Sequence, residues 1–261
     1  MKRLFTILLM LPVLSWATAS YGVFDYSSVE YQHSKNTDEI RSIASITKLF
    51  TAQTVLDSNA DLRELIKVQG KANGRFVRGS LVERYELLRA MLMSSDNLAA
   101  ESLAHAHPGG FDQFIKDVNT RIGDMSLKNT VIVDSTGLLP GNKSTVDDLR
   151  DFLFALRKYT LIQMLSVEKN YTYEYRKGTK SIKVNLRNTN PQMWVYDNII
   201  LTKTGFTNPA GRCLAMLVEK DSGLYAVISL GNTSVQERSK NIASIMGEIG
   251  ENNAILPKNR L

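Results

Sequence analysis

The chain carries the stretch Ser45-Ile46-Thr47-Lys48, followed by Ser95-Asp96-Asn97 and then by Lys203-Thr204-Gly205. Together these three motifs supply a nucleophile, a base, a proton relay and an anchor for a carboxylate. A second SxxK pattern occurs at Ser166–Lys169, but no SxN pattern separates it from Lys203. Only the set that begins at Ser45 keeps the order SxxK, SxN, KTG, with intervals of 50 and 108 residues that let distant segments meet. The ordered triple is the strongest signal in the sequence.

Ser45 and Lys48 are three residues apart at the predicted start of a helix, so their side chains lie on one face. A serine hydroxyl becomes a good nucleophile only when a base removes its proton. Lys48 can be that base if burial or a nearby like charge lowers its pKa towards neutrality. The partial positive charge at the helix N-terminus also favours an alkoxide at Ser45. We therefore predict Ser45 as the nucleophile and Lys48 as its base.

The second motif lies at a predicted junction between two helices. From there Ser95 can relay a proton to the leaving amine, and Asn97 can bind the substrate backbone through its amide. A simpler alternative is that Ser95 or Asn97 only caps the following helix. Both roles can hold at once, so the sequence leaves this point open.

The third motif is expected to end a strand, where it can bind the substrate. Thr204 offers a hydroxyl to a terminal carboxylate, and Gly205 lets the substrate backbone lie close to the strand. Lys203 adds a positive charge that attracts the carboxylate and disfavours protonation of Lys48. The oxyanion formed during acyl transfer needs two fixed donors, for which we predict the backbone N–H groups of Ser45 and Phe206.

Strand-like sequences lie at both ends of the chain, and helical patterns fill the middle. The predicted strands or strand arms are 23–32, 171–176, 181–187, 199–204, 212–218 and 224–230. The predicted helices are 45–56, 81–93, 97–106, 111–122, 146–159 and 235–249. This pattern predicts an α+β fold, in which an antiparallel sheet built from both chain ends is flanked by helices and a helical lobe is inserted.

Residues 1–19 have the basic start, apolar run and small-residue end of a secretory signal peptide. An uncleaved membrane anchor is the alternative, although the apolar run is shorter than the ~20 residues that a span needs. We expect a single two-lobed domain over 20–250, a polar tail over 251–261 and no stable membrane anchor. The net charge of +6, without a basic run interleaved with aromatics, gives no sign of nucleic-acid binding. One cysteine and three histidines argue against a metal site, and we expect no cofactor.

A resemblance to a known family extends to longer stretches around the motifs: 91–100 (MLMSSDNLAA), 135–138 (STGL), 187–190 (RNTN), 201–207 (LTKTGFT) and 210–214 (AGRCL). In these the chain resembles low-molecular-mass penicillin-binding proteins of the D-alanyl-D-alanine carboxypeptidase family, in particular their periplasmic murein DD-endopeptidases. The resemblance covers roughly residues 21 to 250. It implies a penicillin-binding transpeptidase-like or serine β-lactamase-like fold and a periplasmic location.

The resemblance also implies roles for single residues. Ser45 matches the residue that is acylated and Lys48 its base, while Ser95 and Asn97 match the second motif. The residues Lys203, Thr204 and Gly205 match the third motif. Arg187 matches an arginine that such enzymes direct at the substrate carboxylate. The implied reaction is hydrolysis of a D-alanyl bond in peptidoglycan stem peptides or cross-links through an acyl-Ser45 intermediate, with β-lactams as covalent inhibitors.

Two departures from neighbouring families bear on the reaction. No Glu occurs between Ser102 and Val167, so the Glu with which class A β-lactamases deacylate is missing and efficient penicillin hydrolysis is not expected. Only a short tail follows the last predicted helix, which favours a DD-endopeptidase over a carboxypeptidase with an added C-terminal domain. A DD-carboxypeptidase and a non-catalytic penicillin-binding sensor remain as alternatives.

Overall fold

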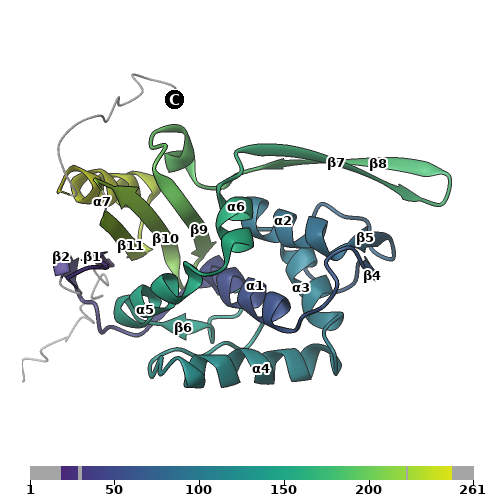
Figure 1. The fold of residues 1–261 in the computed structure, drawn as a ribbon, viewed down its shortest axis with the longest axis horizontal. Helices are drawn as coiled ribbons and strands as arrows, with labels where there is room; N and C mark the ends of the chain where they lie inside the picture. The colour runs from purple at the N-terminus through teal and green to yellow at the C-terminus, as the bar shows by residue number, and fades with distance from the viewer. Residues whose placement is uncertain (1–18, 29–30, 222, 249–261) are drawn as a thin grey trace, which may run out of the picture.

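The computed structural model describes residues 19–28, 31–221 and 223–248. The predicted signal peptide, except Ala19, and the predicted tail 251–261 lie outside the described residues. The described part forms two regions that lie side by side in Figure 1, one built on a sheet and one built mainly of helices.

A five-stranded sheet joins the two ends of the described chain, in the order β2-β1-β11-β10-β9. Its strands are β1 (Ser20–Asp25), β2 (Tyr31–Lys35), β9 (Ile199–Thr207), β10 (Gly211–Lys220) and β11 (Gly223–Asn232). All neighbouring pairs are antiparallel, and β1 pairs along its whole length with β11. The predicted antiparallel sheet built from both chain ends is therefore confirmed.

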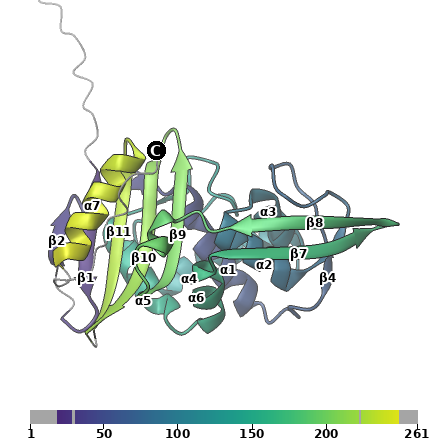
Figure 2. The same cartoon turned by 90° about the horizontal axis from the view of Figure 1, so that it is seen from above.

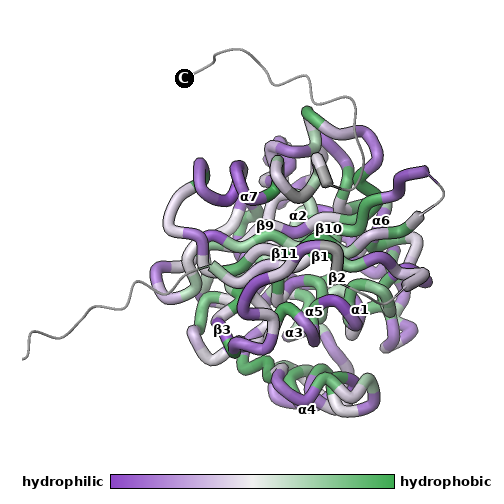
Figure 3. Tube along the Cα trace, turned by 90° about the vertical axis from the view of Figure 1, so that its left-hand side faces the viewer, coloured by the Kyte–Doolittle hydropathy of each residue, from purple (hydrophilic) through white to green (hydrophobic). Residues whose placement is uncertain are grey.

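Alternate residues of the central strands pack on opposite faces of the sheet. On β10, Cys213, Ala215 and Leu217 belong to the core shared with the helical region, whereas Leu214 and Met216 face the other way. Helix α7 (Val235–Glu248) covers this second face, and α5 (Val146–Leu156) lies against the first. Figure 3 shows the apolar stretches of the strands between these helices. Burial on both faces explains why these strands read as continuous apolar runs.

The inserted lobe consists mainly of helices. They are α1 (Thr47–Asp57), α2 (Arg84–Ser94), α3 (Asn97–His105), α4 (Gly110–Asp124) and α6 (Thr160–Val167). The central one is α1, in which every residue from 47 to 55 is buried, including Lys48. It follows directly on the 3-10 turn η1 (Ala44–Ile46), which carries Ser45. The first motif therefore lies where the sheet and the helical lobe meet.

Three two-stranded sheets complete the fold: β3 (Arg41–Ser42) with β6 (Lys143–Ser144), β4 (Leu65–Lys67) with β5 (Leu81–Glu83), and β7 (Asn170–Lys177) with β8 (Lys180–Arg187). The β7–β8 hairpin is separate from the main sheet and extends along the helical lobe (Figure 2). A short 3-10 turn, η2 (Pro191–Trp194), connects the end of this hairpin to β9.

Several predicted boundaries are wrong. The helix predicted from Leu81 begins only at Arg84, because residues 81–83 pair with β4 instead. The segment 160–167 forms α6, for which no helix was predicted. The strand arm predicted over 23–32 spans two strands, since β1 ends at Asp25 and β2 begins at Tyr31. The KTG motif does not end its strand, because β9 continues to Thr207.

Within the residues that the structure describes, none of the helices has the length and apolar character needed to cross a membrane.

Candidate active site

The side chains of Ser45 and Lys48 are in direct contact. Lys48 Nζ lies 2.9 Å from Ser45 Oγ, 2.7 Å from Asn97 Oδ1 and 2.5 Å from the Thr136 carbonyl oxygen. The Ser45 hydroxyl lies 3.4 Å from the same carbonyl. Three oxygens therefore hold the amine beside the hydroxyl, within the distance that proton transfer requires.

Burial lowers the pKa of Lys48 into the range in which its amine can act as a base at neutral pH. Its side chain is fully buried, and burial lowers its pKa from 10.5 to about 7, although Asp134 and Asp96 act in the opposite direction. Burial, and then the charge of Lys48, keeps the pKa of Lys203 well below its ordinary value. Burial therefore makes a neutral Lys48 accessible near pH 7.

The loop 134–142 presents the Thr136 carbonyl to Lys48, and Asp134 organises this loop. Its carboxylate accepts hydrogen bonds from the N–H groups of Thr136 and Gly137 through one oxygen, at 2.6 and 2.7 Å. The other oxygen accepts from the Leu139 N–H at 2.9 Å and from Asn142 Nδ2 at 2.6 Å. Burial would raise the pKa of Asp134, but the hydrogen bonds outweigh it and keep the pKa below its usual value. Asp134 is therefore a fixed anion whose lone pairs are occupied.

The second motif forms the tight junction between α2 and α3. Ser95 ends α2 in the left-handed conformation (φ +57°), which non-glycine residues adopt rarely. Asp96, and neither of its neighbours, caps α3, by accepting a hydrogen bond from the Ala99 N–H at 2.8 Å. Ser95 and Asn97 are left partly exposed, and both line the cleft that contains Ser45. The capping alternative is thus wrong for both residues.

The third motif runs along β9 beside the nucleophile. A Cβ added to Gly205 would come within 2.9 Å of the Ser45 backbone nitrogen, so only glycine fits this approach without a shift. Thr204 Oγ1 lies 2.6 Å from Thr189 Oγ1, and both residues line the cleft. Phe206 follows on the same strand, is 52% exposed and also lines the cleft.

The cleft has a volume of about 470 Å³ and is positively charged. Arg212 on β10 and Arg238 on α7 both contribute to its lining, whereas no acidic residue does so in the part of the chain that the structure describes. The Arg212 guanidinium stacks on the Phe206 ring at 4.5 Å, and its buried Nε has no hydrogen-bond partner among the residues that the structure describes. Burial, and then the charge of Arg212, lowers the pKa of Arg238. An anionic group in the cleft would offer the Arg212 Nε a hydrogen-bond acceptor and would offset the repulsion between the Arg212 and Arg238 guanidinium groups.

Two predicted site residues do not line the cleft. Lys203 is fully buried, donates to the Thr204 carbonyl at 2.8 Å and does not line the cleft. Arg187 is exposed at the end of β8, with its guanidinium 5.0 Å from the centre of the Trp194 ring. Arg187 is not among the residues that line the cleft.

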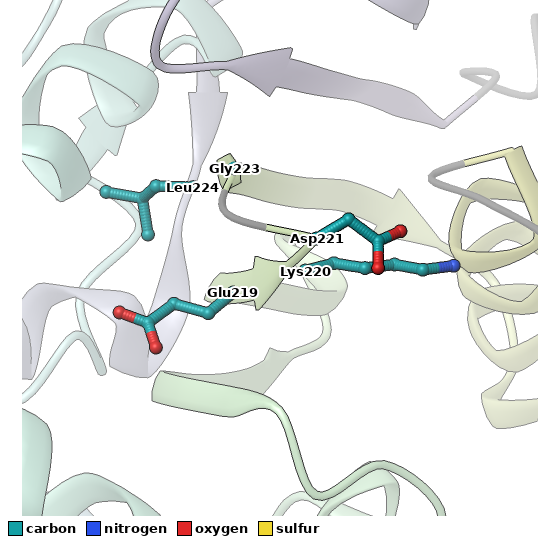
Figure 4. Close-up of a pocket in the computed structure, with 5 residues that line it drawn as sticks. All are labelled: Glu219, Lys220, Asp221, Gly223 and Leu224. Carbon is teal, nitrogen blue, oxygen red and sulfur yellow. The ribbon is translucent and has the colours of Figure 1, made fainter.

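Another hollow lies at the β10–β11 turn, far along the strands from the motifs. Figure 4 shows its lining residues Glu219, Lys220, Asp221, Gly223 and Leu224. Glu219 points to one side there and Lys220 and Asp221 to the other, and none of the motif residues takes part. We therefore place the candidate active site in the cleft at Ser45.

Comparison with known proteins identifies the family. Residues 12–233 match the family model of peptidase S11, described as D-alanyl-D-alanine carboxypeptidase. The chain belongs to this D-alanyl-D-alanine carboxypeptidase family. The match spans all three motifs and the loop around Asp134.

Two curated members of the family are each named D-alanyl-D-alanine endopeptidase. The one from Escherichia coli (strain K12) is 39% identical over 208 residues, and the one from Pseudomonas aeruginosa is 40% identical over 211 residues. Each alignment covers 77% of this chain and 66% of the relative, so the chain spans just under two thirds of their length. The solved structure of the Streptomyces K15 DD-transpeptidase aligns with a TM-score of 0.81, over 88% of this chain and 95% of that one, at 24% identity. The predicted transpeptidase-like fold is thus confirmed.

Sequence reasoning missed the residues that other segments of this family member bring to the site. The stretches 135–138, 187–190 and 210–214 resemble the family in sequence, but no role was predicted for Thr136, Thr189 or Arg212. Arg238 gave no signal at all, because its position depends on how α7 packs against the sheet. Only the three-dimensional arrangement shows that these residues surround Ser45.

Proposed function

We propose that the protein is a serine DD-peptidase that hydrolyses D-alanyl peptide bonds in peptidoglycan through an acyl-Ser45 intermediate. The observation that carries the proposal is the fully buried Lys48, with its amine 2.9 Å from the Ser45 hydroxyl and its pKa at about 7. A structural lysine in a protein core would be costly and needs a compensating role.

Acylation follows from the positions of the side chains. Neutral Lys48 takes the Ser45 hydroxyl proton while Oγ attacks the scissile carbonyl carbon. The backbone N–H groups of Ser45 and Phe206 stabilise the oxyanion. The proton then passes from Lys48, with Ser95 as relay, to the leaving amine as the C–N bond breaks. This leaves an ester between the acyl group and Ser45.

Deacylation returns the enzyme to its initial state. A water molecule attacks the ester, gives up its proton through the same groups and releases the new carboxylic acid together with Ser45. The carboxylates whose charges act on Lys48 are Asp134 and Asp96, and both already accept backbone N–H groups. Neither is free to activate water in the way that the extra Glu of class A β-lactamases does. We therefore propose that β-lactams acylate Ser45 and are released slowly.

The substrate end of the cleft supports a peptide that carries a carboxylate. Thr204, Thr189, Arg212 and Arg238 all line the same cleft. Charged hydrogen bonds from Arg to a carboxylate are among the stronger polar contacts. We propose that these four residues orient the stem peptide, with Asn97 binding its backbone. Lys203 supports Thr204 from beneath by donating to its carbonyl oxygen, and Arg187 lies at the rim.

We propose DD-endopeptidase activity on cross-links as the principal reaction, since the relatives at 39–40% identity carry that name. A DD-carboxypeptidase, after which the family is named, would use the same residues. Residues 1–19 are proposed to export the protein to the periplasm, where the polymer is found, as a single domain over 20–250.

The test is to incubate the protein with purified cross-linked muropeptides, beside Ser45→Ala, and to follow the products by mass. Conversion of dimers to monomers by the wild type only would establish an endopeptidase. Release of free D-Ala from intact dimers would make the protein a carboxypeptidase. Stable labelling by a fluorescent penicillin without either product would indicate a penicillin-binding sensor, and the proposal of hydrolysis would be withdrawn.

A further inference from the structure

Basic side chains are concentrated on two neighbouring segments outside the cleft. Residues 67–78 and 169–187 together contain ten Lys or Arg residues and one acidic residue, in a chain whose net charge is only +6. The basic residues are Lys67, Lys71, Arg75, Arg78, Lys169, Arg176, Lys177, Lys180, Lys183 and Arg187. The rest of the chain is therefore net acidic, so this charge is localised and is not a general property of the surface.

The two segments form one surface. Tyr175 on β7 accepts a hydrogen bond from the Val77 N–H at 2.9 Å, and its ring lies 5.8 Å from that of Phe76. At the hairpin tip, Lys177 Nζ donates to the Arg78 carbonyl at 2.7 Å. We call the exposed residues of segments 67–78 and 169–187 the basic arm.

The charges of the basic arm are exposed and mostly uncompensated. All ten basic side chains are exposed. Within the described part of the chain, only Arg75 and Lys169 have a carboxylate within 4 Å, namely Asp96 at 3.7 Å and Asp197 at 3.4 Å. Like charges collected in this way repel one another, and a partner of opposite charge would lower their energy.

The outer face of the hairpin is polar along its whole length. Alternation along β7 and β8 turns the tyrosines and aliphatic residues towards the helical lobe, and leaves Asn, Thr, Glu, Ser, Lys and Arg on the outer face. Strands of eight residues extend about 27 Å. Such a face has no apolar residues to insert into a bilayer, which a peripheral membrane helix or loop requires.

This face also leads to the active site. The Arg187 N–H donates to Ser94 Oγ at 3.0 Å, and Ser94 Oγ donates back to the Arg187 carbonyl at the same distance. Ser94 precedes Ser95, and Thr189, two residues after Arg187, lines the cleft. A polymer that enters the cleft at Thr189 can therefore continue along the outer face of the hairpin.

We propose that the basic arm is a docking surface for peptidoglycan, which binds the free carboxylates of neighbouring stem peptides while one cross-link occupies the cleft. The inference rests on the proposed function, since that function supplies a carboxylate-bearing polymer next to the arm. A surface of this kind raises the local concentration of enzyme on an insoluble substrate, and its contribution falls as salt screens the charges.

The test compares two triple variants with the same change in charge. Arg176→Gln/Lys180→Gln/Lys183→Gln removes charge from the hairpin. Lys116→Gln/Lys128→Gln/Lys240→Gln removes it from exposed positions elsewhere and serves as the matched control. Both are made in the Ser45→Ala background, so that binding to purified sacculi can be measured by sedimentation without digestion.

We expect the hairpin variant to bind sacculi about tenfold more weakly than the control at low salt, since each exposed charge contact is modest on its own. The difference should vanish at about 0.5 M salt, where the Debye length is only a few ångströms. Sacculi whose carboxylates have been converted to amides should bind both variants equally weakly. Equal binding of the two variants to untreated sacculi would overturn the proposal, and so would a loss seen only with anionic lipid vesicles.

Activity measurements separate this proposal from the proposed function. With Ser45 intact, both variants should cleave small soluble cross-linked muropeptides and react with a fluorescent penicillin at the wild-type rate. The hairpin variant alone should be slower on intact sacculi. If the wild type cleaves no muropeptide at all, the proposed function fails, while the sedimentation result still decides whether the arm binds the polymer.

Discussion

Lowering the pH from 8 to 6 is expected to slow the acylation of Ser45 by a β-lactam about tenfold. Only neutral Lys48 can accept the Ser45 proton, and burial places its pKa at about 7. The neutral fraction is then about nine tenths at pH 8, about half at pH 7 and about one tenth at pH 6. The rate of the chemical step should follow that fraction, so the profile rises with pH and levels off above about pH 8.

The size of the pKa shift comes from the surroundings of the amine. Lys48 is fully buried, and its nearest partners are neutral oxygens of Ser45, Asn97 and Thr136, which compensate the lost hydration of an ammonium group only in part. The charges of Asp134 and Asp96 limit the shift, because they favour the protonated form. An exposed lysine near its ordinary pKa of 10.5 would instead give a rate that still climbs tenfold per unit between pH 8 and 9.

The assay measures the second-order rate of labelling by a fluorescent penicillin between pH 5.5 and 9, which isolates acylation from hydrolysis. Lys48→Arg is the comparison, since arginine keeps the charge but stays protonated throughout. It should lose a factor of about 10²–10⁴ and show no rise with pH, provided that its melting curve shows a folded protein.

A wild-type rate that changes less than twofold between pH 6 and 8 would refute the role of Lys48 as the base. A folded Lys48→Arg protein that keeps more than a tenth of the wild-type rate would do the same. If the larger arginine prevents folding, the wild-type profile still decides the question.

Three further outcomes are expected. Gly205→Ala should fold but acylate about 10²-fold more slowly, because its Cβ would push against the Ser45 nitrogen at 2.9 Å; a labelling rate near that of the wild type would contradict this contact. Asp134→Asn should lower the free energy of unfolding by about 2–6 kcal/mol, measured by urea denaturation, since its amide would face two of the donors that the carboxylate now accepts. The free energy of unfolding should rise from about pH 7 to 10.5, because the unfolded chain binds the Lys48 proton that the folded chain has lost. The gain from this residue is at most about 5 kcal/mol. In Lys48→Met, the urea midpoint should change correspondingly less with pH across that range.

The sequence predicts those parts of the fold whose signals are local. Apolar runs and turn residues locate β9, β10 and β11, and Thr145 with its following acids marks the start of α5, where its side chain does accept the Asp148 N–H. The segment 81–83 was predicted as helix because its neighbours are helical, whereas its pairing with Leu65–Lys67 depends on a distant strand. Helix α6 was missed because the residue before it, Tyr159, provides no side-chain cap. The secondary-structure predictions are therefore wrong where tertiary contacts, and not local sequence, determine the conformation.

In the candidate site too, the contacts between residues close in sequence were predicted, and those that depend on distant segments were not. The spacing of Ser45 and Lys48 on one turn predicts their contact, and burial was one of the two causes named for the lowered pKa. Among the residues that line the cleft, Arg212 and Arg238 carry positive charge, and neither was predicted. Their positions depend on strand register and on the packing of α7, neither of which a motif encodes.

The conformation of the nucleophile itself depends on distant glycines. Ala44 adopts φ +46°, a left-handed value that a residue with a side chain keeps only when its surroundings impose it. Two backbones close on this turn: a Cβ at Gly137 would collide with the Ala44 carbonyl, and one at Gly205 would press on Ala44 and on the Ser45 nitrogen. The loop around Asp134 and strand β9 thus hold Ser45 from both sides, which keeps its hydroxyl at Lys48. The SxxK motif supplies the reacting groups, but their geometry is set by the glycines of two segments far away in the chain, so substitutions at Gly137 and Gly205 should impair acylation as directly as a change of a motif side chain.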